Sequence, residues 1–196
     1  RGRVLLGSSG LGGNGQFVRL SALDSLGDEP WSDSLTEDLD LGVRILLAGY
    51  RLDFCPDVAV HQQGLVSLRR WIRQRTRWFQ GHLQSWALVP DLLVGLRGPR
   101  RLDLYHHLTS PLILLIGSVF TLSFALWMVD LVINLAQGTA EFSWFWLGTY
   151  LFTFAPSVIL GLIYHESERS VNPVKTLLIA HFYVGYAILW MVAGWS

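Results

Sequence analysis

Three long apolar runs in the second half of the chain limit what it can fold into more than any other feature. They cover residues 108–136, 142–164 and 176–195. Each is close to or above the roughly 20 residues that an α-helix needs to cross the hydrocarbon core of a bilayer. Because lipid offers no hydrogen-bond partners to a polypeptide backbone, we expect each run to form a membrane-spanning helix.

The composition supports a membrane protein with a soluble part. Hydrophobic residues make up 51% and charged residues 15%, whereas a soluble domain normally carries about a quarter charged residues. The net charge of +0 averages an acid-rich stretch, residues 24–57, and a basic one, residues 61–101. The basic stretch runs into apolar sequence and carries no nucleic-acid motif, so we expect no nucleic-acid partner. The single cysteine, Cys55, excludes an intrachain disulfide and a thiolate metal site.

Positive charges predict the orientation of the spans. Arginines precede the first run, and Arg169 and Lys175 lie in the short loop between the second and third runs. By the positive-inside rule both places face the cytosol, and the loop at residues 136–141, which has no Lys or Arg, faces outward. We therefore expect an integral plasma (inner) membrane protein whose residues 1–107 are cytosolic.

The cytosolic part divides into two sections. Residues 1–64 contain a glycine-rich loop, a short helix near residues 17–27, a helix from a capping-box pattern at Ser34 to Gly49, and an alternating stretch at residues 50–61. Such a mixture predicts an α/β fold. The arginine-rich and tryptophan-rich residues 65–107 fit amphipathic helices at a membrane interface. The expected domains are thus residues 1–64, 65–107 and an α-helical transmembrane region, 108–196.

Glu37, Asp38 and Asp40 begin a helix that is otherwise apolar. Carboxylates suit the positive end of a helix dipole, so capping accounts for them without any chemistry. The same environment keeps a carboxylate ionised, which suits a general base that accepts a proton from a hydroxyl group. Taken alone, this tripeptide start favours the capping interpretation.

The segment QRTRW, residues 74–78, gathers three functional groups on one helix face. Gln74, Arg77 and Trp78 are three and four positions apart, so an amide, a guanidinium and an indole project together. An indole offers a flat apolar surface to a sugar ring, and a guanidinium binds phosphate oxygens. A juxtamembrane helix anchored by arginine and tryptophan has the same composition, and the pentapeptide alone does not separate the two interpretations.

The order of these motifs resembles that of a known family. Thr36-Glu37-Asp38, then Gln74-x-x-Arg77-Trp78, then membrane spans, is similar to membrane-integrated family 2 glycosyltransferases, which include cellulose, chitin and hyaluronan synthases. The stretch GGNGQFVRLSAL, residues 12–23, also resembles the segment before the Thr-Glu-Asp helix in that family. The resemblance implies that residues 1–64 are the C-terminal portion of a GT-A-type α/β domain.

The resemblance also implies roles for individual residues. Asp38 would be the catalytic base of an inverting transfer from a nucleotide-sugar donor to a growing glycan or a lipid-linked acceptor. Trp78 would stack on the terminal sugar, and Arg77 would lie near the diphosphate of the donor. The residues expected to bind acceptor or substrate are Glu37, Gln74, Arg77, Trp78, Gly13 and Asn14.

Two departures from the family matter. Its Asp-x-Asp motif for metal and nucleotide lies upstream of the glycine-rich loop, and nothing before Gly10 supplies it. We therefore expect the chain to be the C-terminal part of a catalytic domain, inactive alone, with no metal ligand of its own although the complete enzyme needs Mg²⁺ or Mn²⁺. Relatives also often carry an acid near residues 58–68, where this chain has His61, whose role stays open.

The other polar features have ordinary explanations. Residues 7–15 lack the lysine and the spacing of a Walker phosphate loop. We expect His106 and His107 to be interfacial, His181 to pack against other helices, and Asp130 to meet solvent near the outer boundary.

Two alternatives stay open. The aromatic residues of the spans have two interpretations: they line a path for a glycan product, or they face lipid. They are Trp144, Trp146, Tyr150, Tyr183 and Trp190, and lipid exposure is preferred for Trp144 and Trp146. The rival to an enzyme is a non-catalytic membrane scaffold or transporter-like module whose basic helix binds anionic lipid.

Overall fold

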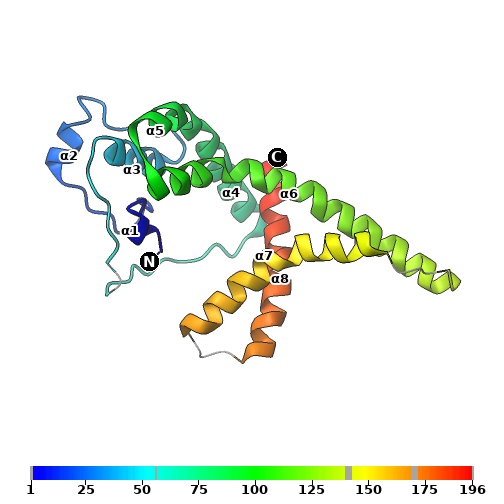
Figure 1. The fold of residues 1–196 in the computed structure, drawn as a ribbon. Helices are drawn as coiled ribbons and strands as arrows, with labels where there is room; N and C mark the ends of the chain where they lie inside the picture. Colours follow the sequence, from blue (N-terminus) through cyan, green and yellow to red (C-terminus); the bar gives the residue numbers. More distant parts are fainter. Residues whose placement is uncertain (1, 56, 140–142, 169–171, 196) are drawn as a thin grey trace. The chain divides into compact units, whose positions relative to one another are not determined.

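The computed structural model describes residues 2–55, 57–139, 143–168 and 172–195, and this part of the chain is largely helical (Figure 1). Residues 1–112 and residues 113–196 each form a compact unit. The helices of the first unit are α1 (Gly2–Leu6), α2 (Leu20–Asp24), α3 (Glu37–Leu47), α4 (Leu68–Gln84), the 3₁₀ turn η1 (Ser85–Leu88) and α5 (Val89–Gly95). The remaining helices are α6 (Gly98–Gln137), α7 (Trp144–Glu168) and α8 (Pro173–Trp195).

The predicted α/β fold is wrong. The described residues contain no β-strand, and residues 51–55 and 57–67 run as extended or irregular chain without a ladder partner. Alternation of apolar and polar residues favours an extended backbone, but a strand forms only where a neighbouring strand accepts and donates its backbone hydrogen bonds. That second condition is not met here, so Phe54, Val58 and Val60 stay exposed.

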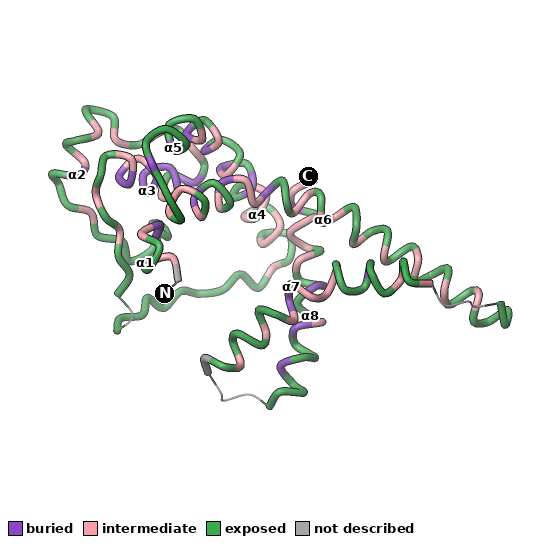
Figure 2. The backbone as a smooth tube through the Cα atoms, in the orientation of Figure 1, coloured by how far each residue is buried: buried purple, intermediate pink, exposed green. Residues whose placement is uncertain are grey.

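Helix α3 is the centre of the first unit. Leu39, Val43 and Leu46 recur at helical spacing and are each less than a tenth exposed, in agreement with the predicted stripe. Figure 2 shows this helix as the most continuously buried segment of the unit. Its stripe joins a cluster of buried leucines from η1, α5 and α6: Leu88, Leu92, Leu96, Leu104 and Leu108. Truncating such a side chain to alanine typically costs about 2–5 kcal/mol.

The ends of α3 differ in how well the sequence predicts them. Gly49, predicted to end the helix, adopts a left-handed φ of +89° just after the C-cap Ala48, as a glycine in this position commonly does. The capping box at Ser34 does not form, because the helix starts at Glu37 and Thr36 makes no side-chain cap hydrogen bond. Ser34 instead directs its hydroxyl to Thr36 and to the carbonyl of Gly81.

Three helices of the described residues are long and apolar enough to cross a membrane, and they coincide with the three predicted spans: Gly98–Gln137, Trp144–Glu166 and Pro173–Trp195. Helix α6 has 40 residues and is therefore about 60 Å long, twice the thickness of a hydrocarbon core. Its first turns, up to residue 112, belong to the first unit, and the predicted apolar run begins within them at residue 108.

Helices α7 and α8 pack closely in the second unit. A Cβ added to Gly161 would lie 3.1 Å from the Cβ of Ala180, so the missing side chain permits this approach. The Tyr150 hydroxyl is 2.7 Å from His181 Nε2, and His181 Nδ1 is 2.8 Å from the carbonyl oxygen of Leu177. His181 thus contacts a neighbouring helix, whereas Asp130 is exposed and accepts a hydrogen bond from Asn134.

Candidate functional site

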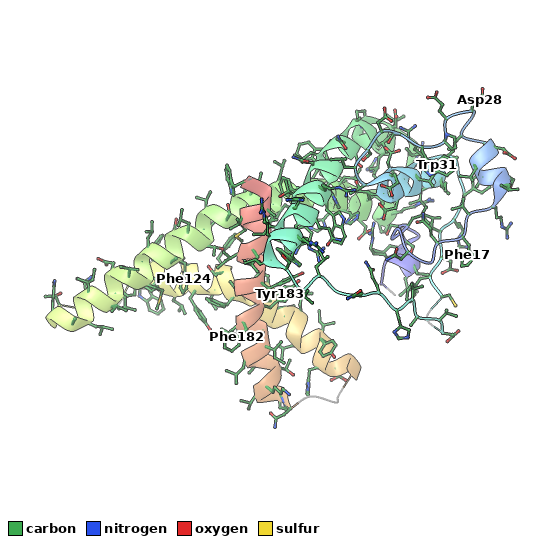
Figure 3. The ribbon with its side chains drawn as sticks, turned by 180° about the vertical axis from the view of Figure 1, so that it is seen from behind. Phe17, Asp28, Trp31, Phe124, Phe182 and Tyr183 are labelled. Atoms are coloured by element: carbon green, nitrogen blue, oxygen red, sulfur yellow. The ribbon has the colours of Figure 1, made fainter. Side chains whose placement is uncertain are left out.

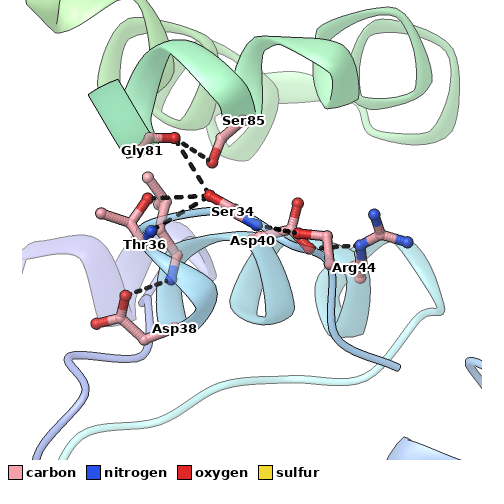
Figure 4. Close-up of polar contacts among 9 residues, drawn as sticks. Ser34, Thr36, Asp38, Asp40, Arg44, Gly81 and Ser85 are labelled. Atoms are coloured by element: carbon pink, nitrogen blue, oxygen red, sulfur yellow. Dashed lines mark hydrogen bonds and ion pairs between the residues drawn. The ribbon is translucent and has the colours of Figure 1, made fainter. Parts of the chain in front are cut away.

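The candidate site is built on the first turn of α3, where three carboxylates have three different environments. Glu37 is exposed, Asp38 is half-buried, and Asp40 is buried. The Asp40 carboxylate binds Arg44 one turn later, at 2.6 Å from Nε to Oδ2, so it forms a structural ion pair within the helix. Figure 4 shows Asp40 and Asp38 pointing to different sides of α3.

One carboxylate oxygen of Asp38 contacts a residue outside its own helix. Its Oδ1 accepts a hydrogen bond of 2.8 Å from the backbone N–H of Leu39 (Figure 4). Its Oδ2 faces Gly13, where an added Cβ would lie only 3.2 Å away.

The glycine-rich loop lies directly against this carboxylate. Gly13 and Gly15 have left-handed φ values of +75° and +62°, which side-chain-bearing residues rarely adopt. A Cβ on Gly15 would meet Val60, and the Asn14 side chain donates a hydrogen bond to Gln62. The segment after α3 therefore covers one side of the loop, and Gly13 presents its bare Cα to Asp38.

The C-terminal end of α4 packs on the residues that precede α3. A Cβ on Gly81 would lie 2.6 Å from the backbone nitrogen of Thr36, so only glycine permits this contact. Ser34 and Ser85 both donate to the Gly81 carbonyl oxygen, and the backbone N–H of Leu35 donates to Gln84 Oε1 at 2.8 Å (the two serine bonds are drawn in Figure 4). The helix that carries the second motif is thereby fixed to the start of the helix that carries the first.

The predicted residues of the second motif lie on α4. Gln74 is half-buried, Arg77 is exposed, and Trp78 is 38% exposed, one helical turn before Gly81. The contacts that join α4 to the residues before α3 run through Gly81 and Gln84, beyond Trp78 in the chain. The structure thus brings Gly13 against Asp38 and places the two motif-bearing helices together, while Asn14 turns to Gln62.

Sequence reasoning missed Arg75. Its guanidinium carbon lies 4.0 Å from the ring centroid of Trp78 and 5.0 Å from that of Trp71, so one cation contacts two indoles. The spacing of four residues to Trp71 and three to Trp78 puts the three side chains on one helix face. This spacing of Arg75 to the two tryptophans can be read from the sequence, but the predicted motif includes Arg77 and not Arg75.

Comparison with known proteins identifies the family. Residues 7–193 match the family described as "Glycosyl transferase family group 2". The chain belongs to this family. No solved structure matches the chain. Membership of glycosyl transferase family group 2 supports the prediction of an enzyme, and the family covers both compact units.

Several curated relatives carry the names of glycosyltransferases. The chain is 32% identical over 131 residues to a beta-monoglucosyldiacylglycerol synthase of Synechocystis sp., covering 64% of this chain and 26% of that protein. It is 25% identical over 179 residues to the probable glycosyltransferase YdaM of Bacillus subtilis, covering 89% of this chain and 41% of that protein. An N-acetylglucosaminyltransferase of Bradyrhizobium diazoefficiens is 33% identical over 91 residues, which cover 44% of this chain and 18% of that protein.

The described residues of this family member gather no metal site. Nowhere in residues 2–55, 57–139, 143–168 and 172–195 do three or more His, Cys, Asp or Glu side chains meet in a way that could hold an ion. His61 is exposed, and His82 and His107 contact each other through their rings, with centroids 5.4 Å apart.

Proposed function

We propose that the whole protein transfers a sugar from a nucleotide-sugar donor to a hydroxyl group of a membrane lipid, with Asp38 as general base. One observation carries the proposal: the glycine loop, the Asp38 carboxylate and the end of α4 meet at the N-terminus of α3. This arrangement supports a site in which the loop admits a substrate close to the backbone and the carboxylate receives a proton.

The proposed reaction inverts the anomeric centre. The acceptor oxygen forms a bond to the anomeric carbon while the bond from that carbon to the phosphate oxygen breaks, and the nucleoside diphosphate leaves with the bonding electrons. Asp38 takes the proton of the attacking hydroxyl group as the general base. The lack of a Cβ at Gly13 leaves room beside Oδ2 for the acceptor.

The other motif residues receive roles by resemblance. Trp78 offers a partly exposed indole on which a sugar ring can stack, and Arg77 offers an exposed guanidinium for the donor's diphosphate. Gln74 and Glu37 would orient the acceptor. Asn14 would act indirectly, because its bond to Gln62 holds the glycine loop.

A lipid acceptor is favoured over a polysaccharide. The names of the relatives in Synechocystis sp. and Trichormus variabilis specify glucosylation of diacylglycerol, and the chain carries three candidate membrane helices. A synthase of the cellulose, chitin or hyaluronan type is the second candidate. We propose an integral inner-membrane protein whose site faces the cytosol. By the positive-inside rule, the basic residues that flank the spans lie on the cytosolic side.

The test is Asp38→Asn in the full-length protein, assayed in membranes with radiolabelled nucleotide sugars and diacylglycerol. We expect transfer to fall by about two to four orders of magnitude, since a positioned base typically supplies that much. The matched control is Asp28→Asn, because Asp28 is an exposed acid outside the site. Unchanged transfer in Asp38→Asn, at equal expression and thermal stability, would instead favour the non-catalytic scaffold.

A divalent cation is a separate part of the proposal. The resemblance implies that the complete enzyme uses Mg²⁺ or Mn²⁺, with ligands from residues other than those described. Treatment of the full-length protein with a chelator is expected to abolish transfer, and readdition of either ion is expected to restore it.

A further inference from the structure

Helix α4 carries an arginine surface, and the proposed function uses only Arg77 of it. Arg69, Arg70, Arg73 and Arg77 are all exposed. At 3.6 residues per turn they fall within an arc of about 100° on one side of the helix. Helix α4 contains no acidic residue, and the described residues next to it in sequence, 58–67 and 85–90, contain none either.

This surface is not neutralised within the described part of the chain. The ion pairs found there are Arg3 with Asp103 and Arg44 with Asp40, so none of the four arginines takes part in one. Two of them, Arg69 and Arg70, lie in the first turn, where the helix dipole disfavours a cation. Arg73 is also four residues from Arg69, a like-charge spacing that costs about 0.2–0.5 kcal/mol.

The far end of α4 lies close to the start of the apolar run of α6. The His82 ring contacts the His107 ring, and the Trp86 indole N–H donates to the carbonyl oxygen of Leu108. Both contacts lie within the first unit, and they join the C-terminal end of α4 and the turn after it to the residues where the predicted apolar run of α6 begins.

We propose that Arg69, Arg70 and Arg73 bind the headgroups of anionic phospholipids, with phosphatidylglycerol as the probe. A phosphate layer relieves both the unfavourable helix start and the like-charge spacing, and it complements a surface with no counter-charge of its own. Arginine suits this role because its planar guanidinium binds phosphate oxygens in pairs. The charge pattern and the lack of an ion pair to these arginines among the described residues carry this proposal, which stands independently of the transfer reaction.

The experiment uses the full-length protein purified in a neutral detergent and titrated with phosphatidylglycerol or phosphatidylcholine, with bound lipid counted by native mass spectrometry. Each arginine near an anionic surface contributes roughly fivefold in affinity. We therefore expect Arg69→Gln with Arg73→Gln to lower the preference for phosphatidylglycerol by roughly 25-fold. Hydrogen exchange of the α4 amides should slow on addition of phosphatidylglycerol in the unmodified protein and not in the double variant.

Two matched variants complete the design. Arg19→Gln with Arg51→Gln removes the same charge from exposed positions outside α4 and should leave the preference unchanged. Arg69→Lys with Arg73→Lys should keep most of it, because the charge remains. Equal preference in the glutamine variant and the unmodified protein would overturn the proposal, as would displacement of the lipid by soluble nucleoside diphosphate. Transfer activity is not the readout, so failure here leaves Asp38 untouched.

Discussion

The first turn of α3 holds three carboxylates, and the first turn of α4 holds two guanidinium groups, so the two helices meet the same dipole with opposite charges. The carboxylates obey the electrostatic rule for a helix start, and the arginines break it. The start of α3 is covered by the glycine loop and by Gly81, whereas the start of α4 is exposed.

The comparison teaches how to weigh charge at a helix end. A favourable charge such as Glu37 or Asp40 needs no function to explain it, and only the contact with Gly13 distinguishes Asp38 from its neighbours. An unfavourable charge such as Arg69 costs about 0.3–1 kcal/mol at an exposed helix start, and the proposed anionic headgroup would offset that cost.

Gly81→Ala disrupts the contact between α4 and Thr36 at the start of α3. We expect it to have the largest effect among the glycine and arginine variants. The new Cβ would lie 2.5–2.6 Å from atoms of Thr36, so α4 must shift. We expect a loss of about 1–3 kcal/mol in unfolding free energy from overpacking. A displacement on the order of 1 Å at the site is expected to lower transfer by about 100-fold.

The control for Gly81→Ala is Gly64→Ala, since Gly64 has no atom within 4 Å of an added Cβ. Thermal unfolding and transfer assays in membranes check both variants. Alanine normally stabilises a helix interior relative to glycine. A rise in the midpoint of unfolding for Gly81→Ala would therefore contradict the contact.

Gly13→Ala sharpens the assignment of Asp38. Its backbone has φ of +75° and its Cβ would crowd Oδ2 of Asp38 at 3.2 Å, so both the loop and the carboxylate must adjust. We expect about a tenfold loss of kcat, since a left-handed conformation costs alanine roughly 1–2 kcal/mol. Gly12→Ala is the matched control in the same loop, with open space around its Cβ. Equal losses in the two variants would argue against a specific contact with Asp38.

Arg75→Met tests the indole pair on α4 and has the smallest expected effect. Removing the cation frees Trp78 from a contact worth about 0.5–1 kcal/mol, so we expect the acceptor KM to rise about two- to fivefold with kcat nearly unchanged. Arg75→Lys should recover part of the loss. Steady-state kinetics with varied acceptor provide the check, and a drop confined to kcat would contradict a role in holding the indole.

The sequence predicts helices better than it predicts their partners. The buried stripe of α3 and its end at Gly49 follow from local periodicity and from the freedom of glycine, and both are confirmed. The same holds for the positions of the three long apolar helices. The α/β fold was wrong because a strand requires a second segment beside it, which the alternation around Val58 and Val60 does not reveal.

The candidate site was predictable in part. The two motifs in order predict a family 2 glycosyltransferase, which the family match confirms, while the membrane-integrated synthase subtype stays a prediction. Contacts between distant segments do not follow from the sequence. Ser34 was predicted to cap a helix, and its hydroxyl instead donates to the Gly81 carbonyl oxygen. Arg75 had no predicted role, and its guanidinium contacts two indoles. The roles of Asp38, Glu37, Gln74, Arg77, Trp78, Gly13 and Asn14 stay predictions.

Arg100 supports the C-terminal end of α3 and is synthesised after Gly81, which contacts the start of this helix. Its guanidinium donates to the carbonyl oxygens of Leu46 and Tyr50, and so binds the negative end of α3 from the start of α6. The helix that carries Asp38 is thus held at one end by residue 81 and at the other by residue 100. A ribosome must release both before α3 is secured, and by then the apolar run of α6 follows directly behind. Both ends of α3 are therefore supported only once the chain has been synthesised as far as residue 100, which lies shortly before the first predicted apolar run.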